Sequence, residues 1–213
     1  MELAELILLI IKLIGTIAFS VSGALVAIDK QLDIFGAMVL GVIAAVGGGV
    51  LRDILLGISP PMMFKEFMFV TTAFTTAFLV FWIEYFRTFT KHRYYYLQVI
   101  NIFDAIGLGI FTVVGVNTAL VYGHSDNWFL AVFIGTTTGI SGGVMRDVLA
   151  GRIPMVLRKQ VYALASITGA VIYYILYHTE MFLTVAMFFS ASIVMLIRFL
   201  AMYFKWSLPR VPQ

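Results

Sequence analysis

Two copies of one fourteen-residue segment hold the residues of this chain that are best suited to chemistry. The copies run from Gly47 to Pro60 and from Ser141 to Pro154, 94 residues apart, and eight of the fourteen positions are identical. Each copy places a run of glycines shortly before an Arg-Asp pair, at the end of a long apolar stretch. Consecutive glycines weaken a helix, so they permit a kink or an unwound turn with free carbonyl oxygens. Such oxygens can replace the hydration shell of a monovalent cation, and the pattern therefore indicates a site for a passing ion.

Both copies contribute to the predicted lining of this site. Its residues are Gly47, Gly48, Gly49, Ser141, Gly142 and Gly143, with the hydroxyl-bearing Thr136, Thr137 and Thr138 just before the second copy. Residues 42–46, which precede the first copy, are wholly apolar, so the two halves of a polar path would be unequally hydrated. The alternative interpretation of the glycines is close packing of helices, because small residues let helix backbones approach in lipid.

Six charged residues stand in or beside the apolar stretches. They are Lys12, Arg52, Asp53, Asp104, Arg146 and Asp147. A charge at membrane depth is costly unless it pairs or faces water. These residues therefore form either structural ion pairs or groups that gate the path and shape its electric field. Lys12 and Asp104 lie 92 residues apart at equivalent positions and carry opposite charges.

The composition excludes a soluble globular domain. Apolar side chains make up 62% of the residues and charged ones 12%, and the mean hydropathy is +1.01. The apolar residues form blocks of about 20, the length that a helix needs to cross the hydrocarbon core. Because every backbone polar group in lipid must be paired internally, we predict helices rather than strands. The expected fold class is an all-α integral membrane protein in contact with membrane lipids.

Other kinds of chemistry have little support in this sequence. There is no cysteine, and the three histidines lie in separate loops, so we expect no metal site beyond transient K⁺ or Na⁺ near the glycines. No nucleophile–base arrangement or nucleotide-binding loop is recognisable. The basic residues sit mostly in short loops, which argues against nucleic acid despite a pI of about 9.2. We expect no enzyme, no cofactor and no nucleic-acid partner.

Seven apolar segments are long enough to be membrane spans. They are residues 6–28, 33–57, 66–86, 97–122, 128–151, 160–178 and 182–204, within a single membrane domain of residues 1–213. If the spans alternate in direction, eleven of the fourteen Lys and Arg residues fall on one side, Arg146 and Arg198 among them. This bias predicts a multi-pass protein of the inner (plasma) membrane, with its N-terminus outside and its C-terminus in the cytoplasm.

The repetition extends beyond the doubled segment. Gly15, Phe19 and Gly23 of the first span match Gly107, Phe111 and Gly115 of the fourth at an offset of 92. Residues 6–86 and residues 97–178 are thus predicted to be two repeats of three helices, and residues 182–204 form a seventh helix. Because three is odd, the second repeat enters the membrane from the opposite side. Such inverted repeats place a binding or permeation site near the midplane, between the two halves.

The doubled Gly-Gly-Val-x-Arg-Asp motif, on inverted three-helix repeats with a seventh helix, resembles the prokaryotic branch of the trimeric intracellular cation (TRIC) channel family. The same bacterial domain is also described as a glycine-transporter-type domain. The resemblance covers nearly the whole chain, residues 6–203. It implies a homotrimer with one pore in each protomer. It further implies that the second and fifth helices kink at Gly47–Gly49 and Gly142–Gly143, line that pore, and pass K⁺ and Na⁺ with little discrimination. Bound lipid is compatible with the resemblance, but Ser141 departs from the triple glycine of the first copy.

The leading hypothesis is therefore a passive channel for monovalent cations. On this hypothesis Gly48→Leu blocks the flux and leaves assembly intact. The alternative from another class is a secondary transporter for a small amino acid such as glycine, because helix breaks offer free amides to a carboxylate and carbonyls to an ammonium group. A third hypothesis is a non-transporting assembly protein whose glycines only pack helices.

Overall fold

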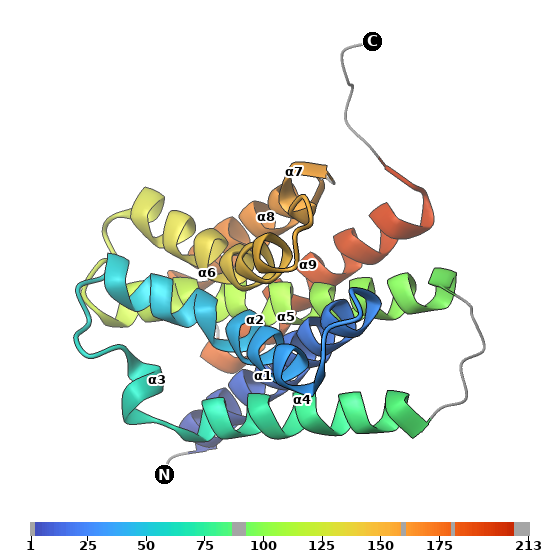
Figure 1. Cartoon of the computed structure of the whole chain (residues 1–213). Helices are drawn as coiled ribbons and strands as arrows, with labels where there is room; N and C mark the ends of the chain where they lie inside the picture. The colour runs from blue at the N-terminus through green and yellow to red at the C-terminus, as the bar shows by residue number, and fades with distance from the viewer. Residues whose placement is uncertain (1–2, 87–92, 159–160, 180–181, 207–213) are drawn as a thin grey trace.

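The structure of the chain, a computed structural model, describes residues 3–86, 93–158, 161–179 and 182–206. All regular secondary structure in these residues is helical (Figure 1). The helices are α1 (Leu3–Asp29), α2 (Ile34–Leu55), α3 (Met62–Lys65), α4 (Met68–Phe86), α5 (Arg93–Val121), α6 (Trp128–Leu149), α7 (Met155–Arg158), α8 (Val161–Tyr177) and α9 (Leu183–Tyr203). Seven of them lie where apolar spans are predicted, and the two short helices α3 and α7 are additional.

Six of these helices are long and apolar enough to cross a membrane, namely α1, α2, α4, α5, α6 and α9. Helix α8 is also apolar, but its 17 residues extend only about 25 Å at 1.5 Å per residue. The long helices carry many exposed large apolar side chains. On α4, for example, Leu79, Trp82 and Ile83 are exposed and only Ala73 and Ala77 are buried. A surface of this kind is stable against lipid and not against water.

The helix ends follow from local sequence signals. Asp33 accepts a hydrogen bond from the Gly36 backbone N–H at the start of α2, and Asn127 does the same for Leu130 at the start of α6. Side chains of this kind satisfy N–H groups that have no partner within the helix. After their last turns, α2 and α6 reach Gly57 and Gly151, which have φ of 70° and 63°. Glycine adopts this left-handed conformation without steric cost, so both helices stop at equivalent points.

The unwound turn predicted at the glycine runs is wrong. Helix α2 continues through Gly47–Gly49 to Leu55, and α6 continues through Gly142–Gly143 to Leu149. The backbone carbonyls at these positions therefore belong to helices and are not released by a break in them. A bend within the continuous helices stays a prediction. Packing on both sides of each helix explains how it persists despite the weak helix propensity of glycine.

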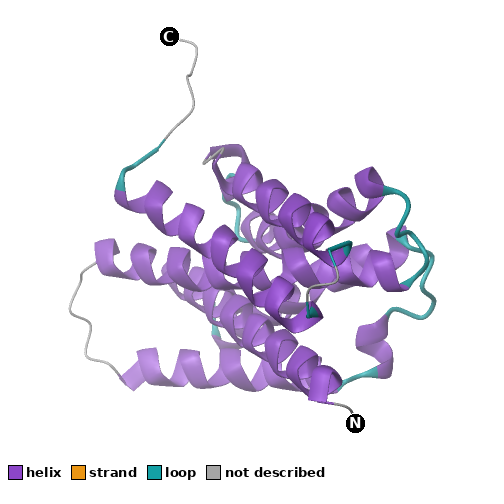
Figure 2. Cartoon of the chain, turned by 180° about the vertical axis from the view of Figure 1, so that it is seen from behind, coloured by secondary structure: helices purple, strands orange, loops and turns teal. Residues whose placement is uncertain are grey.

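The long helices form a bundle around α5, which packs against α1, α6, α8 and α9. The packing partners repeat along the chain: α1 with α2 and α4, and α2 with α4, correspond to α5 with α6 and α8, and α6 with α8. Helices α2 and α6 also contact each other, as do α1 and α5, and α9 covers α5 and α8. Helix α4 lies along the lower edge of the bundle in both views (Figures 1 and 2).

Candidate functional site

Helices α2 and α6 cross where the two glycine runs meet. A methyl group added to Gly48 would lie closer than 3.0 Å to the carbonyl oxygen of Thr138, and one added to Gly142 would lie equally close to the carbonyl oxygen of Ala44. The two contacts are reciprocal, because Gly48 is equivalent to Gly142 and Ala44 is equivalent to Thr138 at the offset of 94. Backbone-to-backbone approach of this kind requires residues without a side chain. These two glycines therefore serve helix packing.

The three glycines of the first copy have different surroundings. A methyl group on Gly48 would meet the backbone of α6, and one on Gly47 would meet the side chain of Met145, also on α6, with the sulfur at 2.7 Å. A methyl group on Gly49 would have the Arg52 Nη2 as its nearest neighbour, 3.9 Å away, so Gly49 faces open space. Successive residues of a helix point about 100° apart, so three consecutive glycines do not share a single contact.

A second reciprocal contact joins α1 and α5. The rings of Phe19 and Phe111, which are equivalent residues, stack with centroids 5.5 Å apart and an angle of 4° between their planes. Gly107 lies against the Phe19 ring, and Gly15 against Phe111 and its neighbour Ile110. The glycines predicted from the repeat thus admit an aromatic pair at the centre of the bundle.

Each Arg-Asp pair connects a long helix to the short helix that follows it. Arg52 donates from Nε and Nη2 to Oδ1 of Asp53, at 2.8 and 2.7 Å, and the Met62 backbone N–H donates to Asp53 Oδ2 at 2.7 Å. Arg146 and Asp147 repeat this arrangement with the backbone N–H of Met155, at 3.0 Å. The carboxylates thereby satisfy the first N–H groups of α3 and α7, which have no partner within the helix. The Arg-Asp pairs have a structural role in both copies.

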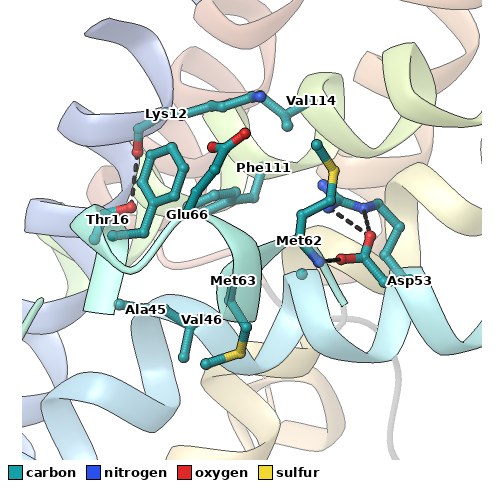
Figure 3. Close-up of a pocket in the computed structure, with 13 residues that line it drawn as sticks. Lys12, Thr16, Ala45, Val46, Asp53, Met62, Met63, Glu66, Phe111 and Val114 are labelled. Atoms are coloured by element: carbon teal, nitrogen blue, oxygen red, sulfur yellow. Dashed lines mark hydrogen bonds and ion pairs between the residues drawn. The ribbon is translucent and has the colours of Figure 1, made fainter. Parts of the chain in front are cut away.

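The first copy borders an open pocket of about 60 Å³ (Figure 3). Helix α1 contributes Lys12 and Thr16 to it, α2 contributes Gly49 and Arg52, and Glu66 lies just after α3. The side chains of Lys12 and Glu66 lie toward one another in this space (Figure 3). A pocket of this volume holds a few water molecules or a small ion. It also contains groups of both charges, so it can bind either a cation or a zwitterion.

None of the residues that line this pocket belongs to the second copy, whose Arg146 and Asp147 are buried. Arg146, with no exposed surface, donates from Nη1 to Asp104 Oδ1 at 2.7 Å and to Ser22 Oγ at 2.5 Å. Asp104 is buried completely as well, and Asp147 lies on the other side of the guanidinium. Lys12 and Asp104 thus occupy equivalent positions with different surroundings, because Lys12 borders an open pocket and Asp104 is fully buried. A buried ion pair persists only where its polar atoms are well partnered.

Two of the four predicted hydroxyls donate hydrogen bonds within their own helix. Thr138 Oγ1 donates to the Ile134 carbonyl at 2.6 Å, and Ser141 Oγ donates to the Thr137 carbonyl. Within the described part of the chain, the buried Thr136 Oγ1 has no hydrogen-bond partner. A hydroxyl that donates a hydrogen bond keeps lone pairs on its oxygen. These hydroxyls can therefore still accept a hydrogen bond from water or coordinate a cation.

Sequence reasoning missed several residues of this region. The predicted span of residues 66–86 includes Glu66, and the sequence predicts no functional role for Tyr162 or Arg198. Arg198 is predicted to lie with the basic residues of one membrane face. In the structure it is 1% exposed within α9, so it is buried as Arg146 is within α6. Its place sixteen residues into an apolar segment was the signal that identifies a membrane-buried charge.

The comparisons with known proteins agree with this geometry. A family model described as glycine transporter matches the chain twice, over residues 9–85 and 101–178. The inner membrane protein YadS of Escherichia coli (strain K12), of the group UPF0126, is 36% identical over 200 residues, which are 93% of each chain.

Solved structures resemble the chain over nearly its full length. A prokaryotic TRIC channel crystallised in 0.5 M KCl is 36% identical, with a TM-score of 0.86 over 96% of this chain and 100% of that one. The TRIC orthologue from Rhodobacter sphaeroides is 30% identical, with a TM-score of 0.85 over 93% and 98% of the two chains. The chain therefore belongs to the prokaryotic branch of the trimeric intracellular cation (TRIC) channel family, whose domain the glycine transporter model describes.

Proposed function

We propose that the protein is a passive channel for monovalent cations, permeable to K⁺ and Na⁺, in the inner membrane. The observation that carries the proposal is the pocket that reaches from α3 to Gly49, beside the crossing of α2 and α6. The likeness to structures named as cation channels supports it, at 36% identity and a TM-score of 0.86 in one case. A passive path needs an entry that is open to water and polar groups that carry no fixed ligand.

The path lies between two inverted repeats, residues 6–86 and 97–178, with residues 182–204 as a seventh helix outside them. Support comes from the two matches of one family model and from the reciprocal contacts of Gly48 with Thr138 and Gly142 with Ala44. Reciprocal contacts are the mark of a two-fold axis between equivalent surfaces. Because each repeat crosses the membrane three times, that axis lies in the membrane plane. The N-terminus of the chain is outside and its C-terminus is in the cytoplasm.

In this channel α2 and α6 line the path, and the glycines at Gly47–Gly49 and Gly142–Gly143 allow both helices to bend. Thr136, Thr137, Thr138 and Ser141 supply oxygens to the permeating ion. Lys12 and Arg52 set the field at the outer pocket, and Arg146 and Asp104 set it in the second half. The family resemblance supports a homotrimer with one path in each protomer, and lipid fills the grooves between exposed apolar helices.

Single-channel recording in planar bilayers with symmetric KCl tests the proposal. We expect discrete unitary openings, and a smaller unitary current for Gly49→Leu, because the new side chain projects into the pocket. Val39→Leu is the matched control, since Val39 is exposed on the outside of the same helix. A folded, inserted protein without openings contradicts the channel. Equal currents in Gly49→Leu and the wild type contradict the pocket as the entry.

A carrier for a small amino acid is a second candidate, because Lys12 and Glu66 place opposite charges in one pocket. Lys12→Gln separates the two functions. In a channel this change removes a cation from the entry, so the K⁺ current rises. In a carrier it removes the partner of a substrate carboxylate, so saturable uptake of labelled glycine into liposomes falls. Measuring both quantities on one preparation decides between them.

A further inference from the structure

The ammonium group of Lys12 stands in the pocket of the first copy without a bonded partner. Lys12 belongs to α1 and borders the pocket together with Arg52 and Glu66. Among the residues that the structure describes, none forms a hydrogen bond or an ion pair with this ammonium group (Figure 3). Its equivalent in the other half, Asp104, is in contrast paired with Arg146 at 2.7 Å. A charge at membrane depth that faces an open space instead of a partner indicates a functional group.

Two of the four charges that line the pocket cancel one another. Arg52 and Asp53 form an ion pair with 2.7 Å between Nη2 and Oδ1, and they are only 6% and 1% exposed. The other oxygen of Asp53 accepts the backbone N–H of Met62 at 2.7 Å. An ion in the open space therefore responds mainly to Lys12 and Glu66, whose side chains lie toward one another (Figure 3).

Glu66 by itself offers the kind of ligand that divalent cations prefer. Its side chain is exposed and follows directly after α3. Carboxylate oxygens and water are the usual ligands of Mg²⁺ and Ca²⁺. K⁺ and Na⁺ need no charged ligand, because neutral oxygens can replace their hydration shell. Since the open volume is only about 60 Å³, a divalent ion held at Glu66 would obstruct the pocket for monovalent ions.

We propose that Lys12 is the residue that keeps divalent cations out of this path. Its positive charge offsets the charge of Glu66, and it repels a divalent ion twice as strongly as it repels K⁺ or Na⁺. The rings of Phe69 and Phe111 line the same space and strengthen the effect, because apolar walls reduce the screening by water. This role of Lys12 rests on the proposed channel function and names the source of its preference for monovalent ions.

Block of the K⁺ current by Mg²⁺ tests the proposal. Unitary currents are recorded in symmetric KCl of constant concentration, while MgCl₂ is added in steps to each side in turn. We expect Lys12→Gln to be half-blocked at a Mg²⁺ concentration lower than the wild type needs by a factor on the order of ten, because the ion then meets the charge of Glu66 alone. Lys12→Met, which keeps the unbranched stem, should show the same shift, and Lys12→Arg should not. Equal half-block concentrations in the wild type, Lys12→Gln and Lys12→Met overturn the proposal.

A double variant separates the charge of Lys12 from its shape. Lys12→Gln combined with Glu66→Gln removes both charges, so the half-block concentration should return to the wild-type value or rise above it. A double variant that is as sensitive to Mg²⁺ as Lys12→Gln alone overturns the proposal.

Lys65→Gln is the matched control. Lys65 is an exposed cation on α3 that does not line the pocket, so its loss should leave the block unchanged. An equal shift in Lys65→Gln and Lys12→Gln would assign the effect to general surface charge and overturn the role of Lys12. A folded wild-type protein that passes no K⁺ current refutes the channel itself, whereas a K⁺ current with an unshifted block refutes only the role of Lys12.

Discussion

Replacing Gly48 by alanine is expected to destabilise the protein, although alanine is the better helix former. The new methyl group would lie closer than 3.0 Å to the Thr138 carbonyl oxygen, and a backbone atom cannot rotate away. Forced separation of packed helices costs about 3 kcal/mol, the upper end of overpacking. The gain in helix propensity is only about 1 kcal/mol. Thermal unfolding in detergent, followed by tryptophan fluorescence, should show a midpoint lower by roughly 5 °C, as expected for a loss of this size.

Gly142→Ala should behave in the same way, because it meets the Ala44 carbonyl in the reciprocal contact. Gly49→Ala is the matched control, since its methyl group finds no atom nearer than 3.9 Å and should leave the midpoint unchanged or raise it. Equal midpoints for Gly48→Ala and Gly49→Ala contradict the close crossing. The result also revises the expectation that Gly48→Leu blocks flux and leaves assembly intact. A larger side chain at the crossing separates α2 from α6.

The second large effect is expected for Arg146→Gln. The guanidinium is fully buried and pairs with Asp104 and Asp147, so its loss leaves two carboxylates without a cation in contact. Removing one partner of a buried ion pair typically costs about 3–5 kcal/mol, because the remaining charge stays desolvated. We expect a strong fall in the yield of folded protein from size-exclusion chromatography, and a lower unfolding midpoint for the fraction that folds.

Two variants show whether the buried charge is the cause. Adding Asp104→Asn to Arg146→Gln removes one of the unpaired carboxylates and should restore part of the loss. Arg52→Gln makes the same change in the first copy, where the pair is also buried but a single carboxylate, Asp53, loses its cation and keeps the Met62 N–H, so its effect should be clearly smaller. Equal losses in Arg52→Gln and Arg146→Gln, without rescue by Asp104→Asn, would show that burial of the second pair is unimportant.

The membrane helices and the repeat were readable from the sequence because both depend on local or periodic information. Apolar length determines a membrane helix, so the predicted spans 33–57 and 128–151 differ only slightly from α2 and α6. The offsets of 92 and 94 residues identified Gly15, Phe19 and Gly48 as members of equivalent pairs. The structure shows two of these pairs, Phe19 with Phe111 and Gly48 with Gly142, at the contacts between the halves.

The tertiary structure alone decided what the glycines and charges do. Glycine both weakens a helix and permits close packing of two helices, so the residue type alone does not decide its role, and the contact with α6 decides it for Gly48. The same Arg-Asp pair borders a pocket in the first copy and a closed core in the second, because Tyr162 and Arg198 cover only the second. These neighbours come from helices far along the chain. Membrane helices and equivalent positions were therefore set by the sequence locally, whereas the hydration and partner of each charge were set by packing between helices.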